Sequence, residues 1–257
     1  MVWRRNAQGV GSFGSTQAIR LTEGSDIVGF VHTTGYLHRG GDRSAGIRFL
    51  LYPPGRRAIG YALLDRAQEY LADVPGSDVL AFSQSFRYPF YHRSAAFLSD
   101  RLGHVQALFQ MRGFKRFRGE VFLDWDDYAC VDPGKPAWPV EIEPTRAQYR
   151  GRLPALKNTA KLDGEEIGEC SIVSCGDYAE HEDVQDRLFV ALLDIAEPYQ
   201  GKGLGRYLLR RTMNDARDVG YRHAAISTAM DNSRAFLFYS NYGFRVSDYT
   251  YGWRLER

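Results

Sequence analysis

Residues 192–211, LLDIAEPYQGKGLGRYLLRR, decide the fold of this chain. An apolar segment leads into three closely spaced glycines, Gly201, Gly203 and Gly205, and an amphipathic segment follows at once. This pattern predicts a β-strand, a glycine-rich turn and then a helix. The first turn of a helix leaves N–H groups without partners and favours anions, and glycines let the backbone approach an anion closely. The junction is therefore predicted to hold phosphate, and a glycine-rich turn without a ligand is the alternative.

Two familiar phosphate motifs do not fit this junction. The dinucleotide pattern G-x-G-x-x-G fails because Arg206 stands where the third glycine belongs. The nucleoside-triphosphate loop fails because Lys202 is followed by Gly203 in place of Ser or Thr. The pattern that fits is Q/R-x-x-G-x-G/A after a strand, with Gln200, Gly203 and Gly205 in the defined positions. It resembles the coenzyme A loop of the GNAT N-acetyltransferases.

A second motif follows in residues 232–244, NSRAFLFYSNYGF. Asn232 can cap a helix that Gly243 ends. The spacing N-x6-Y-x3-G-F, with Tyr239 at its centre, is similar to the fourth helix of the same family. The resemblance extends over the whole chain as architecture, but its specific motifs lie between residues 192 and 244.

The resemblance implies a role for each motif. In GNAT enzymes the strand before the loop binds the thioester end of acetyl-CoA, the loop binds the diphosphate, and the later helix supplies Asn and Tyr. Carried to this sequence, it implies Tyr239 near the sulfur as the catalytic residue, because a phenol keeps its proton at neutral pH and can protonate a leaving thiolate. A structural tyrosine with its ring in the core is the competing interpretation. The implied acetyl-CoA-binding residues are Leu193, Asp194, Ile195, Gln200, Gly201, Lys202, Gly203, Leu204, Gly205, Arg206 and Asn232.

The base that takes the proton from the amine is not assigned by the sequence. Several acidic and histidine side chains lie near the expected site, but none has a spacing that singles it out. These candidates are Asp194, Glu197, His181, Glu182, Asp183 and His223.

The order hairpin, strand, helix, strand, helix, strand occurs twice along the chain. We therefore expect an α/β fold of α+β type with mixed sheets, formed by two GNAT-like acyl-CoA N-acyltransferase domains in tandem. A segment rich in proline and glycine separates the halves. The predicted division is a degenerate domain at 1–130, a linker at 131–136 and a catalytic domain at 137–257.

The first copy is predicted to have lost its chemistry. Ala58 falls at the position of Gly203, and Phe109, which has no proton to give, falls at that of Tyr239. The first copy also carries an aromatic segment, residues 86–92, FRYPFYH. This segment is expected either to line or cover the acceptor pocket or to pack in the domain interface.

The second copy departs from the family at its start. A full GNAT domain opens with a strand and two helices that build one wall of the acceptor site, yet only residues 137–156 precede the first hairpin. The wall must then come from the other half or from another subunit, and a homodimer is one such arrangement.

Composition narrows the choice of partners. The formal net charge of +2 and the scattered arginines provide no basic field for nucleic acid. The apolar run at 188–193 is too short to span a bilayer, and residues 1–15 have no secretory pattern, so we predict a cytoplasmic protein without a membrane partner. The His and Cys residues show no ligand spacing, so no metal is expected, and Cys170 and Cys175 are predicted to be buried thiols.

These observations lead to one hypothesis with two alternatives. The chain is expected to transfer the acetyl group of acetyl-CoA to a primary amine, that of a small molecule, by direct attack on the thioester. The alternatives are an acetyltransferase that acts on protein N-termini or lysines, and a non-catalytic acyl-CoA-binding or scaffold protein.

Overall fold

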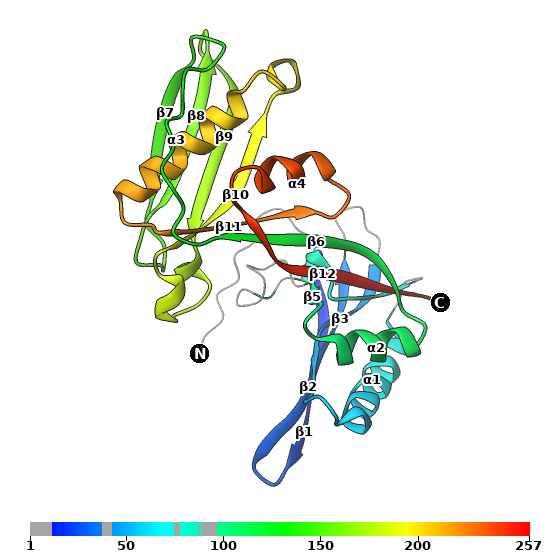
Figure 1. Ribbon diagram of the computed structural model, residues 1–257. Coiled ribbons are helices and arrows are strands. Elements are labelled where there is room, and N and C mark those ends of the chain that lie inside the picture. Colours follow the sequence, from blue (N-terminus) through cyan, green and yellow to red (C-terminus); the bar gives the residue numbers. More distant parts are fainter. Residues whose placement is uncertain (1–11, 38–42, 75–77, 87, 89–96) are drawn as a thin grey trace. The chain divides into compact units, whose positions relative to one another are not determined.

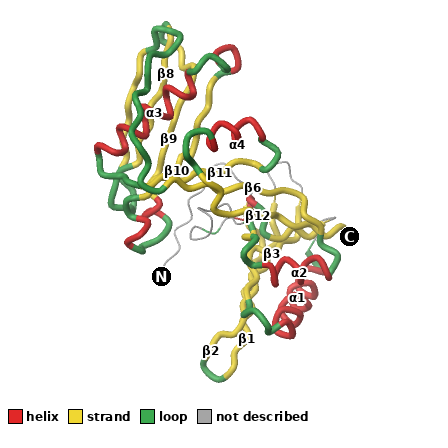
Figure 2. The backbone as a smooth tube through the Cα atoms, viewed as in Figure 1, coloured by secondary structure: helices red, strands yellow, loops and turns green. Residues whose placement is uncertain are grey.

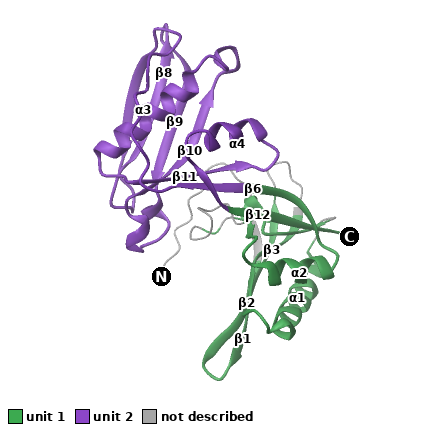
Figure 3. Cartoon of the chain, in the orientation of Figure 1, with its two compact units in different colours: residues 1–120, 248–257 green, residues 121–247 purple. Residues whose placement is uncertain are grey.

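The computed structural model describes residues 12–37, 43–74, 78–86, 88 and 97–257 (Figure 1). The chain forms two compact units (Figure 3). Unit 1 comprises residues 1–120 and 248–257, and unit 2 comprises residues 121–247. Both contain strands and helices, as Figure 2 shows, in agreement with the predicted mixed fold. Within the described ranges, no helix is long and apolar enough to cross a bilayer.

In its described residues, unit 1 is a mixed sheet with two α-helices. Strands β1, β2 and β3 are antiparallel neighbours, and β3 pairs in parallel with β4. A parallel pair needs a crossover, which α1 supplies. The last residues of β12 lie antiparallel to β4 on its other side. The elements are β1 (Ser12–Glu23), β2 (Asp26–Leu37), β3 (Arg43–Leu51), α1 (Arg57–Ala72), β4 (Asp78–Ala81), η1 (Gln84–Phe86), β5 (Leu98–Ser99), α2 (Gly103–Met111), β6 (Lys115–Trp125) and β12 (Arg245–Glu256).

One face of this sheet packs on α1. The helix buries Ile59, Leu63, Ala67 and Leu71, which recur at the spacing that the sequence predicts for one helix face. They form one core with strand residues that include Val31, which is fully buried. This apolar core between α1 and the sheet stabilises unit 1.

The opposite face of the sheet carries aromatic side chains. His32 follows Val31 in β2 and so lies on the face opposite α1. Its ring nitrogen is hydrogen-bonded to the hydroxyl of Tyr88. The Arg48 guanidinium lies 4.6 Å from the centre of the Tyr88 ring and donates to the carbonyl of Phe86. Phe86 and Tyr88 are thus packed on unit 1's own strands, while the remainder of the aromatic segment 86–92 lies outside the described residues.

Unit 2 has a similar element order to unit 1, with one additional strand, β7, at its start. Strands β7, β8, β9 and β10 are antiparallel neighbours, β10 pairs in parallel with β11, and α3 connects them. The buried side of α3, which includes Leu204, Leu208 and Met213, packs against β8, β9 and β10. The elements are β7 (Glu141–Ala147), β8 (Ala155–Leu162), β9 (Glu165–Ser174), η3 (Cys175–Asp177), η4 (Glu182–Val184), β10 (Arg187–Ile195), η5 (Glu197–Tyr199), α3 (Leu204–Asp218), β11 (His223–Ala229) and α4 (Ser233–Ser240).

Strand β7 was not predicted from the sequence. Its residues EIEPTRA are mostly exposed and contain Pro144, so they show no alternation of buried and exposed positions. Proline is tolerated in an edge strand, and β7 pairs with β8 alone among the described strands. Seven residues, 148–154, join β7 to β8, and they contain no helix.

The compact units are bounded differently from the predicted domains. Strands β6 and β12 each contribute residues to both units, and Trp253 of β12 lies opposite Ala81 of β4. The expected linker 131–136 belongs to unit 2, where the carbonyl of Val131 accepts a hydrogen bond from Asn214 of α3 at 3.1 Å. Sequence periodicity locates a strand but does not identify its partner, so the sequence alone does not show that the end of β12 pairs with β4.

The environment of His32 makes the stability of the protein sensitive to acid. Burial, and to a smaller extent the Arg48 guanidinium, lowers the pKa of His32 from 6.5 to about 4. Between these values the unfolded chain binds the proton more readily, so stability is lost as the pH falls from about 6.5 towards 4. We expect His32→Gln to reduce this loss, measured as the change in urea unfolding midpoint with pH. His181→Gln, at an exposed position of unit 2, is the control and should retain the loss. Equal acid sensitivity in the His32 variant and the unsubstituted protein would contradict the prediction.

Candidate active site

A cavity of about 730 Å³ opens in unit 2 between the end of β10, the start of α3 and one face of α4. All but two of the predicted site residues line it. From β10 and the loop these are Leu193, Asp194, Ile195, Gln200, Gly201, Gly203, Gly205 and Arg206, and from α4 and its cap they are Asn232 and Tyr239. The two sequence motifs therefore meet in one place.

The two predicted residues outside the lining are Lys202 and Leu204. The Lys202 ammonium lies 4.9 Å from the centre of the Trp138 ring, which in turn packs edge-on against Tyr199. Leu204 is only 1% exposed and anchors the start of α3 in the core. Their side chains thus support the loop from outside the cavity.

One edge of β10 is open where it forms the cavity wall. The strand pairs with β9 as far as Ile195, but with β11 only at Arg187, Leu188 and Phe189. A register shift between Val190 and Leu192 marks a β-bulge at the point where the two strands part. The exposed edge beyond the bulge offers main-chain groups to an extended ligand, in the manner of an added strand.

Hydrogen bonds at the end of β10 show which amides face the opening. Ala196 donates its N–H to the carbonyl of Ile167, towards β9, at 2.9 Å. Because successive residues of a strand point their N–H groups to alternate sides, the N–H groups of Leu193 and Ile195 point towards the opening. The carbonyl of Ile195 accepts a hydrogen bond from the Gln200 side chain at 2.7 Å. Gln200 therefore ties the loop to the end of the strand.

The glycine loop has the conformation that its sequence predicts. Gly201 and Gly203 have φ of 75° and 89°, which residues with a Cβ rarely adopt. Gly203 is the N-cap of α3 and makes no side-chain cap, so the first amides of the helix are left for a ligand. Arg206, in the first turn of the helix, adds a positive charge at the cavity. The helix dipole and this guanidinium both favour an anion.

Helix α4 supplies the opposite wall. The Asn232 side chain accepts a hydrogen bond from the N–H of Ala235 at 3.1 Å, so it caps the helix as predicted. Tyr239 lines the cavity with 7% of its surface exposed, and its ring packs edge-on against Phe238 and Phe244. Burial, with a smaller contribution from the Cys170 thiol, raises the pKa of Tyr239. The phenol is therefore protonated throughout the physiological pH range.

Cys170 and Cys175 are both buried, as predicted. Burial raises the pKa of Cys170 to about 12, so it does not form a reactive thiolate at neutral pH. Among the described residues, no group of three His, Cys, Asp or Glu side chains is placed to hold a metal ion.

Of the candidate bases, only Asp194 lines the cavity. His181 instead caps η4, where its ring nitrogen accepts from the N–H of Asp183. The His223 ring accepts from the N–H of Asp127 at 3.1 Å and lies at the first residue of β11, at the other end of the parallel pair from the loop. The geometry thus separates the histidines from the cavity.

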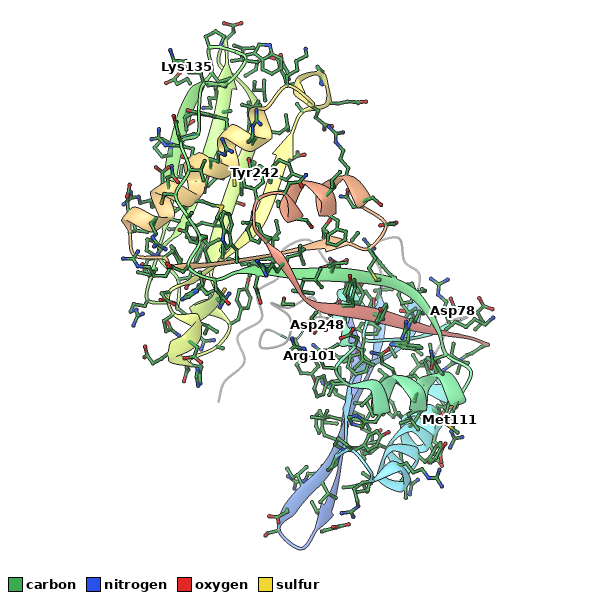
Figure 4. The ribbon with its side chains drawn as sticks, in the orientation of Figure 1. Asp78, Arg101, Met111, Lys135, Tyr242 and Asp248 are labelled. Atoms are coloured by element: carbon green, nitrogen blue, oxygen red, sulfur yellow. The ribbon has the colours of Figure 1, made fainter. Side chains whose placement is uncertain are left out.

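Sequence reasoning missed five residues of the lining, all on or just after α4. Tyr242, labelled in Figure 4, follows the helix, and the Arg210 guanidinium of α3 lies 5.5 Å from the centre of its ring. The helical spacing from Tyr239 could have identified some of them, because residues three or four apart share one face. The five are Arg234, Ala235, Phe238, Asn241 and Tyr242.

The sequence of this region matches a known family. Residues 122–244 match the family model described as the acetyltransferase (GNAT) family. This part of the chain is a GNAT acetyltransferase domain. The match covers nearly the residues of unit 2 and leaves unit 1 unmatched. No curated protein matches the chain in sequence.

Solved structures resemble the fold over most of the chain. A tandem GNAT protein from the clavulanic acid biosynthesis pathway, without AcCoA, has a TM-score of 0.66 and 17% identity, with 94% of this chain and 83% of that chain covered. A GCN5-related N-acetyltransferase from Sphaerobacter thermophilus has a TM-score of 0.59 and 14% identity, covering 93% and 80%. A glucosamine N-acetyltransferase region of a fungal multi-domain GH3 β-N-acetylglucosaminidase has a TM-score of 0.63 and 14% identity, covering 90% and 32%.

These likenesses confirm the predicted fold class. The tandem duplication and the degenerate state of the first copy stay predictions, because the family model matches residues 122–244 alone. The GNAT fold places unit 2's loop, β10 edge and α4 around a single cavity.

Gly203→Val tests the loop geometry. A β-branched side chain is strained at φ of 89°, so the turn before α3 must rearrange and withdraw its amides from the ligand. We expect at least about a tenfold weaker affinity for coenzyme A by calorimetry, equivalent to about 1.4 kcal/mol. Gly164→Val, at φ of 84° in the turn between β8 and β9, is a control with matched backbone strain outside the cavity. Equal affinities in the two variants would contradict the assignment of the loop.

Proposed function

We propose that the chain is an acetyl-CoA-dependent N-acetyltransferase and that unit 2 transfers the acetyl group to the primary amine of a small molecule. The observation that carries this proposal is the single cavity that combines an uncapped helix start, an open strand edge and a buried phenol. Each of these meets a different part of an acyl-CoA thioester. A glycine-rich turn without a ligand would account for the first feature only.

The proposed arrangement assigns the diphosphate to the start of α3 and the pantetheine arm to the edge of β10. The first amides of α3 and the Arg206 side chain would bind the phosphate oxygens. The N–H groups of β10 that face the opening would bind the amides of the arm and the thioester carbonyl. Asn232 uses its side-chain oxygen to cap α4, so its amide NH2 group is the part left to contact the arm.

The residues of this site suit direct transfer of the acetyl group from the thioester to the amine. When the amine nitrogen attacks the thioester carbon, an N–H of Leu193 or Ile195 would stabilise the charge that develops on the carbonyl oxygen. As the carbon–sulfur bond breaks, Tyr239 would give its proton to the departing thiolate, and the amine nitrogen would release its own proton to solvent, from which the phenol is reprotonated. The raised pKa of Tyr239 keeps that proton in place until the thiolate forms. Asp194 is the carboxylate of the lining, but no contact assigns it the role of base.

The packing of unit 1 favours a structural, non-catalytic role for the first copy. Phe109 is fully buried, stacks on Trp253 and packs edge-on against Phe82 and Phe114. The N–H of Phe82 also donates to the carbonyl of Ile47 at 2.9 Å, just where β3 and β4 cease to pair. Aromatic side chains and a backbone bond thus fill the place that unit 2 leaves open, which is why we assign the chemistry to unit 2.

The proposed acceptor is a small-molecule amine, and a protein amine is the alternative. Residues 148–154 stand where the resemblance expects two helices, and a protein N-terminus or lysine could approach if that side is open. A cytoplasmic location and a homodimer are part of the same proposal. A thiol-release assay with acetyl-CoA and a panel of small amines and peptides separates these acceptors. Binding of acetyl-CoA without turnover on any of them would favour a scaffold.

Tyr239→Phe tests the acid directly. The variant keeps the ring in its packing site but has no proton to give, so kcat should fall roughly ten- to a thousand-fold while the KM for acetyl-CoA changes little. Tyr221→Phe is the control, because that buried hydroxyl donates to the carbonyls of Leu153 and Pro154 outside the cavity. It should lower stability and leave kcat near normal. Full turnover by the Tyr239 variant would show that its role is structural.

A further inference from the structure

An arginine that the loop motif does not include faces the phosphate-binding turn from the other side of the cavity. Arg234 is the second residue of α4 and lines the cavity together with Gly201, Gly203 and Arg206. Its guanidinium donates to the side-chain oxygen of Gln200 at 3.3 Å. Two walls built by different helices therefore present positive charge to the same space.

The bonding of Arg234 differs from that of Arg211 on α3, which has a carboxylate partner. Arg211 pairs with Asp215 at 3.1 Å, and Arg210 donates to the carbonyl of Asp132. In the described part of the chain, Arg234 forms no ion pair with a carboxylate, and its one recorded partner is the neutral amide of Gln200. A hydrogen bond from guanidinium to phosphate is charge-assisted and about twice as strong as one between neutral groups. An anion in the cavity can therefore replace Gln200 as the partner.

Gln200 holds the guanidinium in place until that exchange. Its side chain donates to the carbonyl of Ile195 at 2.7 Å and accepts from Arg234, so it joins the end of β10 to α4 across the cavity. The amide can make both bonds because it has donors and an acceptor at opposite ends. This bridge keeps the long arginine side chain near the turn and reduces the entropy that is lost when it binds a ligand.

We propose that Arg234 determines the specificity of the site for the nucleotide end of the acyl carrier. Its guanidinium binds an oxygen of the diphosphate opposite the amides of the turn, and Gln200 positions it for that contact. The site then selects acyl carriers with a diphosphate over those that end at pantetheine. This inference rests on the proposed function, because it assumes that the cavity takes coenzyme A.

A competing role is purely structural. The bond between Gln200 and Arg234 could serve only to brace the loop against α4, in which case its loss would disturb the whole cavity. The two roles differ in what they predict for a carrier that lacks the phosphates. Bracing affects every acyl donor equally, whereas a diphosphate contact affects only donors that carry the diphosphate.

The test compares acetyl-CoA with acetyl-pantetheine as donors for the full-length protein and its Arg234→Gln variant. We expect the variant to raise the KM for acetyl-CoA about tenfold, the equivalent of one lost charge-assisted bond, with kcat near normal. Its KM and kcat with acetyl-pantetheine should match those of the unsubstituted protein. Arg234→Lys keeps the charge and should recover part of the affinity for acetyl-CoA. Arg211→Gln removes an arginine of α3 that is paired with Asp215 and lies outside the cavity. It should leave KM and kcat unchanged with both donors.

Calorimetry with coenzyme A and pantetheine gives the same comparison without turnover. If the protein acetylates no amine but binds coenzyme A, the proposed catalytic function fails while the inference on Arg234 is still decided by the two affinities. Added salt should weaken coenzyme A binding less in Arg234→Gln than in the unsubstituted protein, because one charge contact is gone. If Arg234→Gln weakens the affinity for coenzyme A and for pantetheine equally, or does not weaken the affinity for coenzyme A, the proposed role of Arg234 is overturned.

Discussion

The separation of β10 from β11 is the constraint on which the rest of unit 2 depends. The two strands pair through Phe189, and the bulge that follows turns β10 away while its other edge stays bonded to β9. Main-chain N–H and C=O groups at such an edge need partners. Gln200 satisfies the carbonyl of Ile195, and the remaining groups face the cavity. The opening is thus a property of the backbone, and the side chains around it adapt to it.

In unit 1, β3 also separates from its parallel neighbour β4 after a few residues, but here described residues of the chain itself fill the gap. A register shift in its pairing with β2 places a bulge in β3 at Arg48, just beyond the last residues that β3 pairs with β4. There the Arg48 guanidinium bonds the carbonyl of Phe86, and Phe82 bonds Ile47. The aromatic core around Phe109 occupies the remaining space. A strand that separates from its neighbour leaves a cavity only where nothing from the chain itself fills the gap.

The two faces of the unit 2 sheet are also unlike. Asn158, Cys170 and Leu193 form one cross-strand row, and the Asn158 side chain bonds Thr212 of α3, which fixes this face under the helix. The alternate residues on the other face include Lys157 and Glu169, which form an ion pair at 3.0 Å. A sheet face that carries charged pairs does not need a helix to bury it, which fits the short connection at 148–154.

The sequence by itself determined the local geometry of the site. Glycines at 201 and 203 take positive φ because residues without a Cβ can, and Asn232 caps α4 because its side chain reaches the third amide of the helix. These are short-range effects that a few adjacent residues fix. Only the tertiary structure decided that Arg234 faces the glycine loop and that residues 253–256 pair with β4, because strand partners and facing helix surfaces are set by packing between distant segments. The periodicity of a sequence predicts an element and which of its sides is buried. It does not predict what that side contacts, because the contact depends on how distant segments pack in the whole fold.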